Sequence, residues 1–189
     1  MNRTGIIISL VLLIAFGVAT RLMPHEPNAT ALTGIAIAAS LYLGRKWTLP
    51  LVFGILFISD VFIGFYDIRI MASVYGSFAI VALIAWFAQK NKIIVTAGAA
   101  VVGSAISFFL VTNFAVWLFS PWYAKSIAGL LYSYELGLPF LRNMFLGDVL
   151  YTTVTIAAFE TALLLLGAYS RSRKKSVASG TPEQHRAYI

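Results

Sequence analysis

The chain has 189 residues, of which 60% are hydrophobic and 11% charged, whereas an ordinary soluble domain has about 45–50% and 25%. This composition excludes a soluble globular fold. Cysteine is absent, which excludes disulfide bonds, thiolate catalysis and thiolate metal sites. The net charge of +7 would favour nucleic acid as a partner in a soluble protein, but in so apolar a chain the position of the charges is more informative than their sum.

Six uncharged apolar segments follow one another along the chain, at 4–20, 27–44, 47–59, 70–89, 93–124 and 149–169. A helix needs about 20 residues to cross a bilayer core, so the second and third segments are short unless their ends lie in the interface. Continuous rather than alternating apolar runs argue against an outer-membrane barrel. The sequence therefore predicts an all-α polytopic membrane protein with six transmembrane helices in one bundle at 1–170. A polar, disordered cytoplasmic tail is expected at 171–189.

The basic residues are distributed unequally between the two sides of the membrane. With a cytoplasmic N-terminus, ten fall inside: Arg3, Arg45, Lys46, Lys90, Lys92, Arg171, Arg173, Lys174, Lys175 and Arg186. Four fall outside: Arg21, Arg69, Lys125 and Arg142. Because cytoplasmic loops carry the excess of Lys and Arg, both termini are predicted to be cytoplasmic. The N-terminal segment also fits a cleaved signal peptide, but five further apolar segments make a membrane helix the preferred interpretation.

The first outer connector is polar and contains Pro24 and Pro27, which forbid a continuous helix. Arg21, His25 and Asn28 offer hydrogen-bond donors and acceptors there. The connector is therefore either a ligand-facing loop or a rigid turn closed by a salt bridge. One His beside one Glu is a poor metal site, since zinc needs three or four ligands.

Asp60 lies in the third segment, roughly 20 Å along a helix that starts at Trp47. This position is inside the apolar slab, where an ionised carboxylate must face a cavity or a partner. The adjacent Ser59 adds a hydroxyl. We expect a functional site here or, alternatively, a structural ion pair with Arg21 or Arg142.

The fifth segment is too long for one perpendicular crossing. A helix that starts at Ile93 has crossed a bilayer core of about 30 Å near Asn113. Asn113 and Trp117 are therefore expected at the outer interface. An aromatic belt explains Trp117, but the Asn113 amide needs hydrogen-bond partners. The amphipathic stretch 120–141 predicts a lid over a cavity, with an interfacial helix or a re-entrant segment as alternatives.

The last helix is expected to open near Phe140. On it, Asp148 and Tyr151 share one face, and Asn143 lies within about 140° of Asp148. Glu160 is predicted near mid-bilayer, either as a proton or cation relay or as a hydrogen-bonded packing residue. Small residues at four-residue spacing predict close helix approaches at three pairs: Ala15 with Ala19, Gly34 with Ala38, and Ala99 with Gly103.

Four stretches carry a resemblance to a known family: RLMPHEPNAT, SDVFIG, TNFAVW and NMFLGDVLY. In this order they resemble a widespread family of small bacterial six-helix membrane proteins, known mainly as a domain of unknown function. Members of that family look like the S components of energy-coupling-factor vitamin transporters, which have both termini inside and an outward-facing ligand cavity capped by loops. The family tends to continue Pro-Asn-Phe-x-Pro, whereas this chain has Ala29-Thr30-Ala31 after Asn28, so the second helix is expected to start differently.

The resemblance implies a substrate-binding transport protein of the bacterial cytoplasmic membrane that captures a small polar nutrient and performs no reaction on it. An energising transmembrane and ATPase module is the implied partner besides the lipid bilayer, because the chain has no phosphate-binding glycine loop. The predicted substrate-binding residues are Arg21, His25, Asn28, Asp60, Asn113, Trp117, Arg142, Asn143 and Asp148. Two alternatives remain: a membrane scaffold without a ligand, and an intramembrane enzyme using Asp60 and Asp148 as acid and base or as metal ligands.

Overall fold

The structure is a computed structural model of the full chain, and it describes residues 3–87 and 92–179, with side chains up to residue 168. The elements in this part of the chain are all helical. They are α1 (Arg3–Leu22), α2 (Leu32–Ala38), η1 (Ala39–Leu43), η2 (Arg45–Trp47), α3 (Thr48–Ile63), α4 (Ile68–Trp86), α5 (Ile93–Phe119) and α6 (Ile127–Ser179). The predicted all-α class with six helices is confirmed.

Local chemistry explains where these helices end. The α1 helix stops just before the Pro24 to Pro27 connector. Gly44 and Gly64 follow η1 and α3 with φ angles of 102° and 101°, a conformation that glycine adopts without steric cost. The Asp67 carboxylate accepts a hydrogen bond from the Arg69 amide and so caps the first turn of α4.

Five of the helical stretches are long and apolar enough to cross a membrane: Arg3–Leu22, Arg45–Ile63, Ile68–Trp86, Ile93–Phe119 and Ile127–Ala168. The sixth, Leu32–Leu43, is shorter and ends in a π-helix. This second helix begins only at Leu32, because the preceding residues form a turn around Asn28. The protein is therefore a multi-pass membrane protein. Of the two segments that the sequence marked as short, the second is short in the structure, whereas the third belongs to a 19-residue span.

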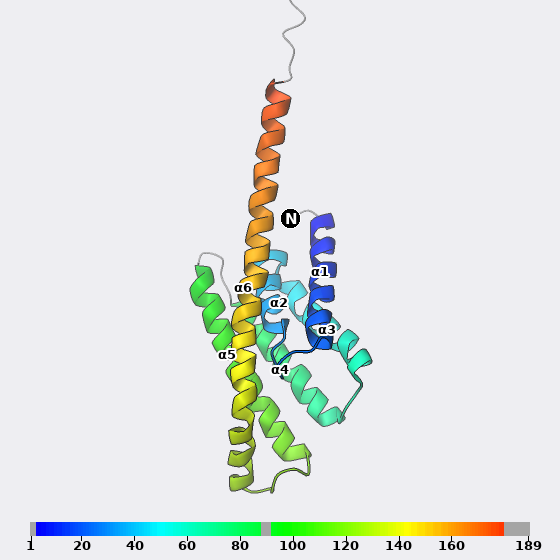
Figure 1. Ribbon diagram of the computed structural model, residues 1–189, viewed down its shortest axis with the longest axis vertical. Helices are drawn as coiled ribbons and strands as arrows, with labels where there is room; N and C mark the ends of the chain where they lie inside the picture. Colours follow the sequence, from blue (N-terminus) through cyan, green and yellow to red (C-terminus); the bar gives the residue numbers. More distant parts are fainter. Residues whose placement is uncertain (1–2, 88–91, 180–189) are drawn as a thin grey trace, which may run out of the picture.

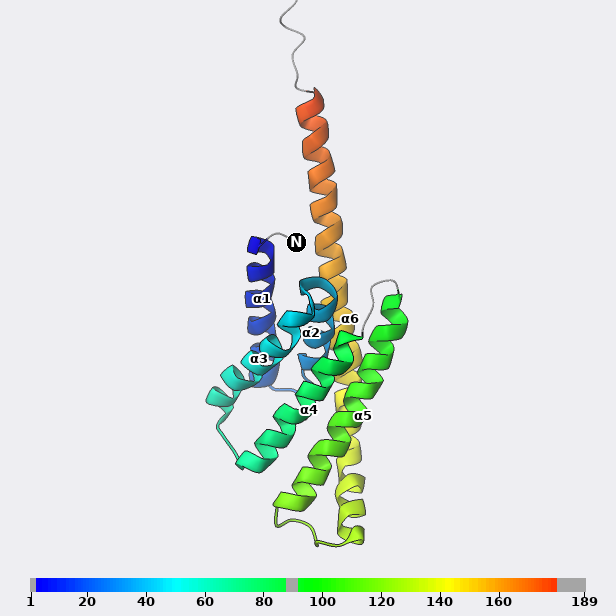
Figure 2. The same cartoon turned by 180° about the vertical axis from the view of Figure 1, so that it is seen from behind.

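The short α2 helix lies in the middle of the bundle and every one of its residues is buried. It packs against α6 on one side and against α3 and α4 on the other, while α1 packs on α3 and α5 lies between α4 and α6 (Figures 1 and 2). The first turn of α1 and the far end of α6 point to the same side of the molecule (Figure 1). The predicted cytoplasmic location of that side remains a prediction.

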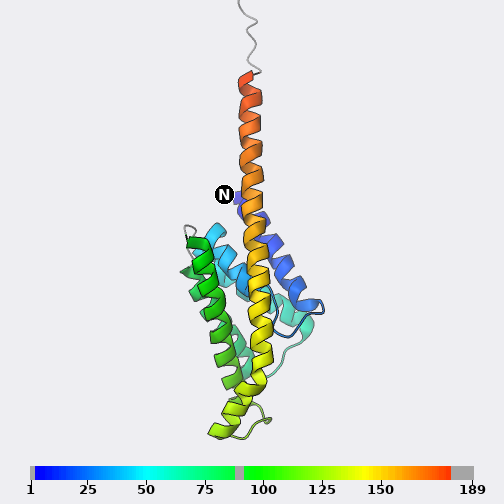
Figure 3. The same cartoon turned by 60° about the vertical axis from the view of Figure 1, so that its left-hand side comes forward.

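The α6 helix differs most from expectation. It begins at Ile127 rather than near Phe140, so the stretch 120–141 is neither a lid nor a re-entrant segment but a turn followed by the first part of α6. Pro139 lies inside the helix and is exposed. At about 1.5 Å per residue, a helix of 53 residues is far longer than a bilayer core of about 30 Å, and it extends beyond the bundle (Figure 3).

The domain boundary predicted at 170 falls within this helix. Helix α6 continues to Ser179, past the start of the predicted disordered tail at 171. The rest of that tail, 180–189, lies outside the described residues.

Glycines allow several of the closest helix contacts. A Cβ atom on Gly34 would lie 2.7 Å from the Thr152 backbone nitrogen, so the predicted small-residue face at Gly34 and Ala38 is where α2 meets α6. On α1 the buried small residue is Gly17, which packs under Ile55, whereas Ala15 of the predicted pair is exposed.

Candidate functional site

The connector between α1 and α2 has a defined conformation. Asn28 has a φ of 67°, which asparagine tolerates better than most residues. The Ala29 amide donates to the Glu26 carbonyl at 2.9 Å, and the Ala31 amide donates to Thr20 Oγ1 on α1 at 3.3 Å. These bonds hold the loop as a compact turn beside the ends of α1 and α3, as the two prolines predicted.

A cavity of about 350 Å³ lies beneath this loop, and we call it the outer pocket. Its polar wall comes from the loop, the end of α1 and the α3–α4 linker, and its apolar wall from α3, α4, α5 and α6. The lining residues are Arg21, His25, Asn28, Thr30, Ile63, Tyr66, Val74, Phe78, Phe108 and Met144. Phe78 and Phe108 pack with ring centroids 5.1 Å apart. The outer pocket thus gathers three of the predicted site residues: Arg21, His25 and Asn28.

A buried ion pair between Arg21 and Asp60 lies next to this pocket. Arg21 Nη2 donates to Asp60 Oδ1 at 2.5 Å, and Tyr75 Oη donates to Asp60 Oδ2 at 2.9 Å. Arg21 Nε donates to Ser59 Oγ at 2.6 Å. The Asp60 side chain is only 1% exposed, against 14% for Arg21. The sequence left the partner of an Asp60 ion pair open between Arg21 and Arg142, and the structure shows that it is Arg21.

This arrangement determines what Asp60 can contribute. Both carboxylate oxygens accept hydrogen bonds from other side chains, so Asp60 orients Arg21 and is not a lining residue of the outer pocket. The negative charge of Asp60 also balances the guanidinium that lines the pocket. A ligand therefore meets a fixed hydrogen-bonding group without a large net charge.

Tyr66 adds a further polar group from the linker between α3 and α4. Burial raises the pKa of the Tyr66 phenol above its ordinary value of 10.0, and the negative charge of Asp60 raises it further against the opposing effect of Arg21. The phenol consequently stays protonated at neutral pH and can donate a hydrogen bond into the pocket.

Asn143 lies in a second depression, of about 370 Å³, next to the outer pocket. Its lining residues are Pro24, His25, Glu26, Ala29, Asn143, Leu146, Gly147, Leu150 and Tyr151. His25 lines both cavities, and its Nδ1 atom is 2.7 Å from the Met23 carbonyl oxygen. The loop therefore separates two neighbouring depressions, with Asn143 outside the pocket that contains Arg21.

Asn113 and Trp117 take part in contacts at the far end of α5. The Asn113 amide donates to the Phe109 carbonyl at 2.9 Å, and its Oδ1 atom packs where a Cβ on Gly137 would lie. Trp117 Nε1 donates to the Ala124 carbonyl at 2.9 Å, and Lys125 Nζ donates to the Trp117 carbonyl. The Asn113 amide thus finds its partner on its own helix and packs against Gly137 of α6, and Asn113 does not line the outer pocket.

Arg142 and Asp148 also lie apart from the outer pocket. Arg142 lines a shallow apolar depression between α5 and α6. Asp148 is 1% exposed and faces α2, next to Thr33. Glu160 is exposed and accepts a hydrogen bond from Tyr42 at 2.5 Å. This agrees with the prediction of Glu160 as a hydrogen-bonded packing residue.

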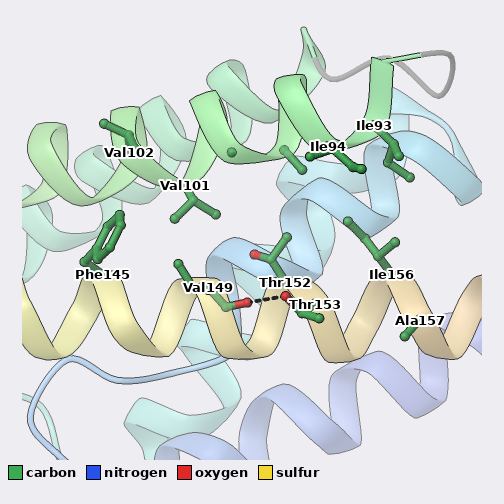
Figure 4. Close-up of a pocket in the computed structure, with 12 residues that line it drawn as sticks. Ile93, Ile94, Val101, Val102, Phe145, Val149, Thr152, Thr153, Ile156 and Ala157 are labelled. Carbon is green, nitrogen blue, oxygen red and sulfur yellow. Dashed lines mark hydrogen bonds between the residues drawn. The ribbon is translucent and has the colours of Figure 1, made fainter.

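Among the four cavities described, the one with the greatest volume, about 440 Å³, lies between α5 and α6 and is almost entirely apolar. Figure 4 shows Val101, Val149 and Ile156 lining it, with the Thr153 hydroxyl bonded to the Val149 carbonyl at 2.8 Å. Such a surface offers few groups that could orient a polar molecule. The outer pocket is therefore the better candidate site.

Several lining residues of the outer pocket were not predicted. Tyr66 lines the pocket, and Tyr75 bonds to Asp60 beside it. Both lie in or beside the apolar α4 segment, where a phenol usually needs a hydrogen-bond partner, and this was the signal available in the sequence. Val74, Phe78 and Met144 carry no such signal, since apolar residues on membrane helices are ordinary. Within the described residues, no three His, Cys, Asp or Glu side chains come together as a metal site.

The comparisons with known proteins place the chain in a family. Residues 2–173 match the model of a family described as "Family of unknown function (DUF6580)". Neither the curated proteins nor the solved structures compared with the chain gave a match. Because the family model covers nearly the whole transmembrane part, the chain belongs to this family of unknown function.

Proposed function

We propose that this protein is a substrate-binding membrane protein that captures a small amphipathic molecule in the outer pocket. The observation that carries the proposal is the pocket's two-sided lining, in which an oriented guanidinium, an imidazole, an amide and a phenol face an apolar wall with two aromatic rings. Ligand sites are typically apolar cavities with a few fixed polar groups. The outer pocket has this composition.

Size and charge narrow the class of ligand. A cavity of about 350 Å³ is at the small end of the range of about 300–1,000 Å³ for ligand pockets. Asp60 is fully engaged by Arg21 and Tyr75, which disfavours a cationic ligand. A neutral or weakly anionic molecule with one flat apolar part and a few hydrogen-bonding groups fits best.

The wider role follows from the resemblance to S components of energy-coupling-factor transporters. A pocket on the side opposite the chain termini suits a protein of the bacterial cytoplasmic membrane that takes up a nutrient from outside. The chain has no phosphate-binding glycine loop, so energy for transport would come from a separate transmembrane and ATPase module.

The paired-aspartate enzyme is less well supported. Asp60 is bonded to Arg21 and Tyr75, whereas Asp148 lies beside Thr33 in the α2–α6 contact. A general acid and base must reach the same reacting group. The two carboxylates have different surroundings and line no common cavity among those described.

A thermal-shift screen of the detergent-purified protein against vitamins, their precursors and other small heterocycles tests the proposal. A ligand that binds only the folded state raises the unfolding temperature by mass action. We expect the shift to be lost in Asn28→Gly, which keeps the positive φ but removes the amide, and reduced in Tyr66→Phe. The control Asn143→Ala alters only the neighbouring depression and should keep the shift.

Two outcomes would contradict the proposal. One is the absence of any shift across a broad panel with folded protein. The other is a shift that Asn28→Gly and Tyr66→Phe leave intact. Either result would favour the membrane scaffold, in which the polar residues are merely structural.

A further inference from the structure

A second polar cluster lies away from the outer pocket, in the contact between α2 and α6. The Asp148 side chain is buried, and its Oδ2 atom has no hydrogen-bond partner among the described residues. The Thr33 side chain lies beside this carboxyl, yet Thr33 Oγ1 makes no well-formed hydrogen bond. Thr152 Oγ1, one turn further along α6, is likewise buried and unbonded. Three buried oxygen atoms thus have unused hydrogen-bonding capacity.

The Thr152 hydroxyl is informative because its neighbours behave differently. Threonine hydroxyls inside membrane helices commonly donate to a carbonyl of the preceding turn. Thr153 does so to Val149 at 2.8 Å and Thr155 to Tyr151 at 2.7 Å. Thr152 does not, and its hydroxyl is buried without a hydrogen-bond partner on α6, where Gly34 of α2 meets this helix. This oxygen is therefore available to a group held between α2 and α6.

Charge balance indicates what that group is. A carboxyl group in an apolar interior is neutralised by a proton or balanced by a positive partner. The ion pairs of the described residues are Arg21 with Asp60 and Arg69 with Asp67, and neither involves Asp148. Carboxylate and hydroxyl oxygens are the donors that hard cations prefer. A small cation would satisfy the charge and the three oxygens together.

We propose that Asp148, Thr33 and Thr152 form a binding site for a sodium ion between α2 and α6. The single carboxylate neutralises one positive charge, whereas a divalent ion would keep an uncompensated charge in the bundle. The helices are close here, since a Cβ on Gly34 would lie 2.7 Å from the Thr152 backbone nitrogen. This close packing favours sodium over the larger potassium ion.

The site would have a structural consequence for the bundle. Helix α2 follows directly after the loop that carries Asn28, and its fully buried surface packs on α6. A sodium ion bridging Thr33 to Asp148 would fasten α2 to α6 and so stabilise the folded state. This consequence does not depend on whether the outer pocket binds a ligand.

The test is a salt titration of the purified full-length protein. NaCl replaces N-methyl-D-glucamine chloride at constant ionic strength, and the thermal unfolding temperature is followed, with KCl as a parallel series. We expect a saturable rise in unfolding temperature with sodium and a much weaker rise with potassium. Thr152→Val and Thr33→Val keep the side-chain shape, and each should raise the half-saturating sodium concentration about tenfold or more, the cost of one bond to a charged group.

Controls make the result decisive. Thr153→Val removes a hydroxyl from the same helix that already bonds to Val149, and it should keep the full sodium response. Asp148→Asn should abolish that response. The proposal is overturned if the unfolding temperature is the same in all three salts, which would leave the carboxyl balanced by a proton, or if Asp148→Asn keeps the sodium response. Should Asp148→Asn fail to fold, equal responses in Thr152→Val and Thr153→Val overturn it as well.

Discussion

Arg21 connects the buried acid to the surface of the outer pocket. It donates to Asp60 and Ser59 at the same time, while its exposed fraction of 14% leaves part of the guanidinium facing the cavity. Two fixed bonds from one guanidinium reduce its freedom before any ligand arrives. Such pre-organisation lowers the cost of binding.

Removing Arg21 should therefore destabilise the protein strongly. Arg21→Ala leaves the Asp60 carboxylate buried without a counter-charge, which costs about 3–5 kcal/mol of unfolding free energy. Unfolding in SDS titrations of the detergent-solubilised protein would measure it. The double variant Arg21→Met with Asp60→Leu should recover much of this loss, because no buried charge remains. Arg69→Met, which breaks an exposed pair, is the control and should change little.

Asp67 offers a test that depends on pH. Hydrogen bonds from the Arg69 side chain and amide lower the pKa of Asp67 from 3.8 to about 2. A lowered pKa means that the carboxylate stabilises the folded state at pH values above 3.8 and that this contribution is lost as the pH falls toward 2. The wild-type protein should unfold at a slightly higher temperature than Asp67→Asn at neutral pH. The difference should vanish across the pH window from 3.8 to 2, and a constant difference would contradict the role assigned to Asp67.

At the residue level, sequence reasoning predicted the polar half of the outer pocket. Charged and amide side chains in an apolar chain are conspicuous, so Arg21, His25 and Asn28 could be recognised without coordinates. Asn113 and Asp148 were equally conspicuous, but neither lines that pocket, and the structure buries Asp148 and packs Asn113 within helix contacts. The polarity of a residue alone cannot show whether its side chain contacts a ligand or a neighbouring helix. In either place a buried polar group obtains the hydrogen-bond partners that it needs.

At the level of helices, α2 is held against α6 by a backbone contact at Gly34. A Cβ atom there would approach the Tyr151 carbonyl carbon and the Thr152 nitrogen to 2.7 Å, and backbone atoms cannot yield as a flexible side chain can. The close approach also allows Thr155 Oγ1 to reach the Gly34 carbonyl at 3.3 Å. The second helix is short but is the most completely buried one.

Gly34→Ala should consequently push α2 away from α6 and cost about 1–3 kcal/mol of unfolding free energy, the usual range for overpacking. Gly54→Ala is the matched control, because that position in the middle of α3 has open space around it. Its expected effect is neutral or stabilising by up to about 1 kcal/mol, from the higher helix propensity of alanine. SDS unfolding of both variants measures the difference, and equal stabilities would contradict the close contact.

Helix boundaries were predictable where glycine or proline ends a helix and not where proline lies within one. The turn after α1 and the ends of η1 and α3 follow their local sequence. Pro139 and Gly129 suggested a break before Phe140, yet α6 runs through both. A proline inside a helix removes one backbone hydrogen bond and crowds the carbonyl of the preceding turn, and the packing of α5 along α6 offsets this cost.

For the whole molecule, orientation in the membrane remains the principal prediction from charge. The structure has the start of α1 and the far end of α6 on one side and the turn between α5 and α6 on the other (Figure 1). Ten basic residues are assigned to the first side and four to the second. Because cytoplasmic loops carry the excess of Lys and Arg, the first side is predicted to be cytoplasmic.

Cysteine accessibility can test this orientation directly, because the natural chain has no cysteine. Glu135→Cys, at the exposed start of α6, should react with a membrane-impermeant maleimide in intact cells. Arg45→Cys, in the exposed η2 turn, should react only after the membrane is opened. The reverse pattern would show that the outer pocket opens to the cytoplasm.

The central claim is that the outer pocket holds a small molecule, and its most direct test is mass spectrometry of the compounds released from protein purified out of the native membrane. The wild-type protein should release a defined small molecule in near-stoichiometric amount. Val74→Trp, which fills the outer pocket, should release none, whereas Leu146→Trp, in the neighbouring depression, should release as much as the wild type. A compound carried equally by Val74→Trp, or no compound together with no binding in the thermal-shift screen, would contradict the account.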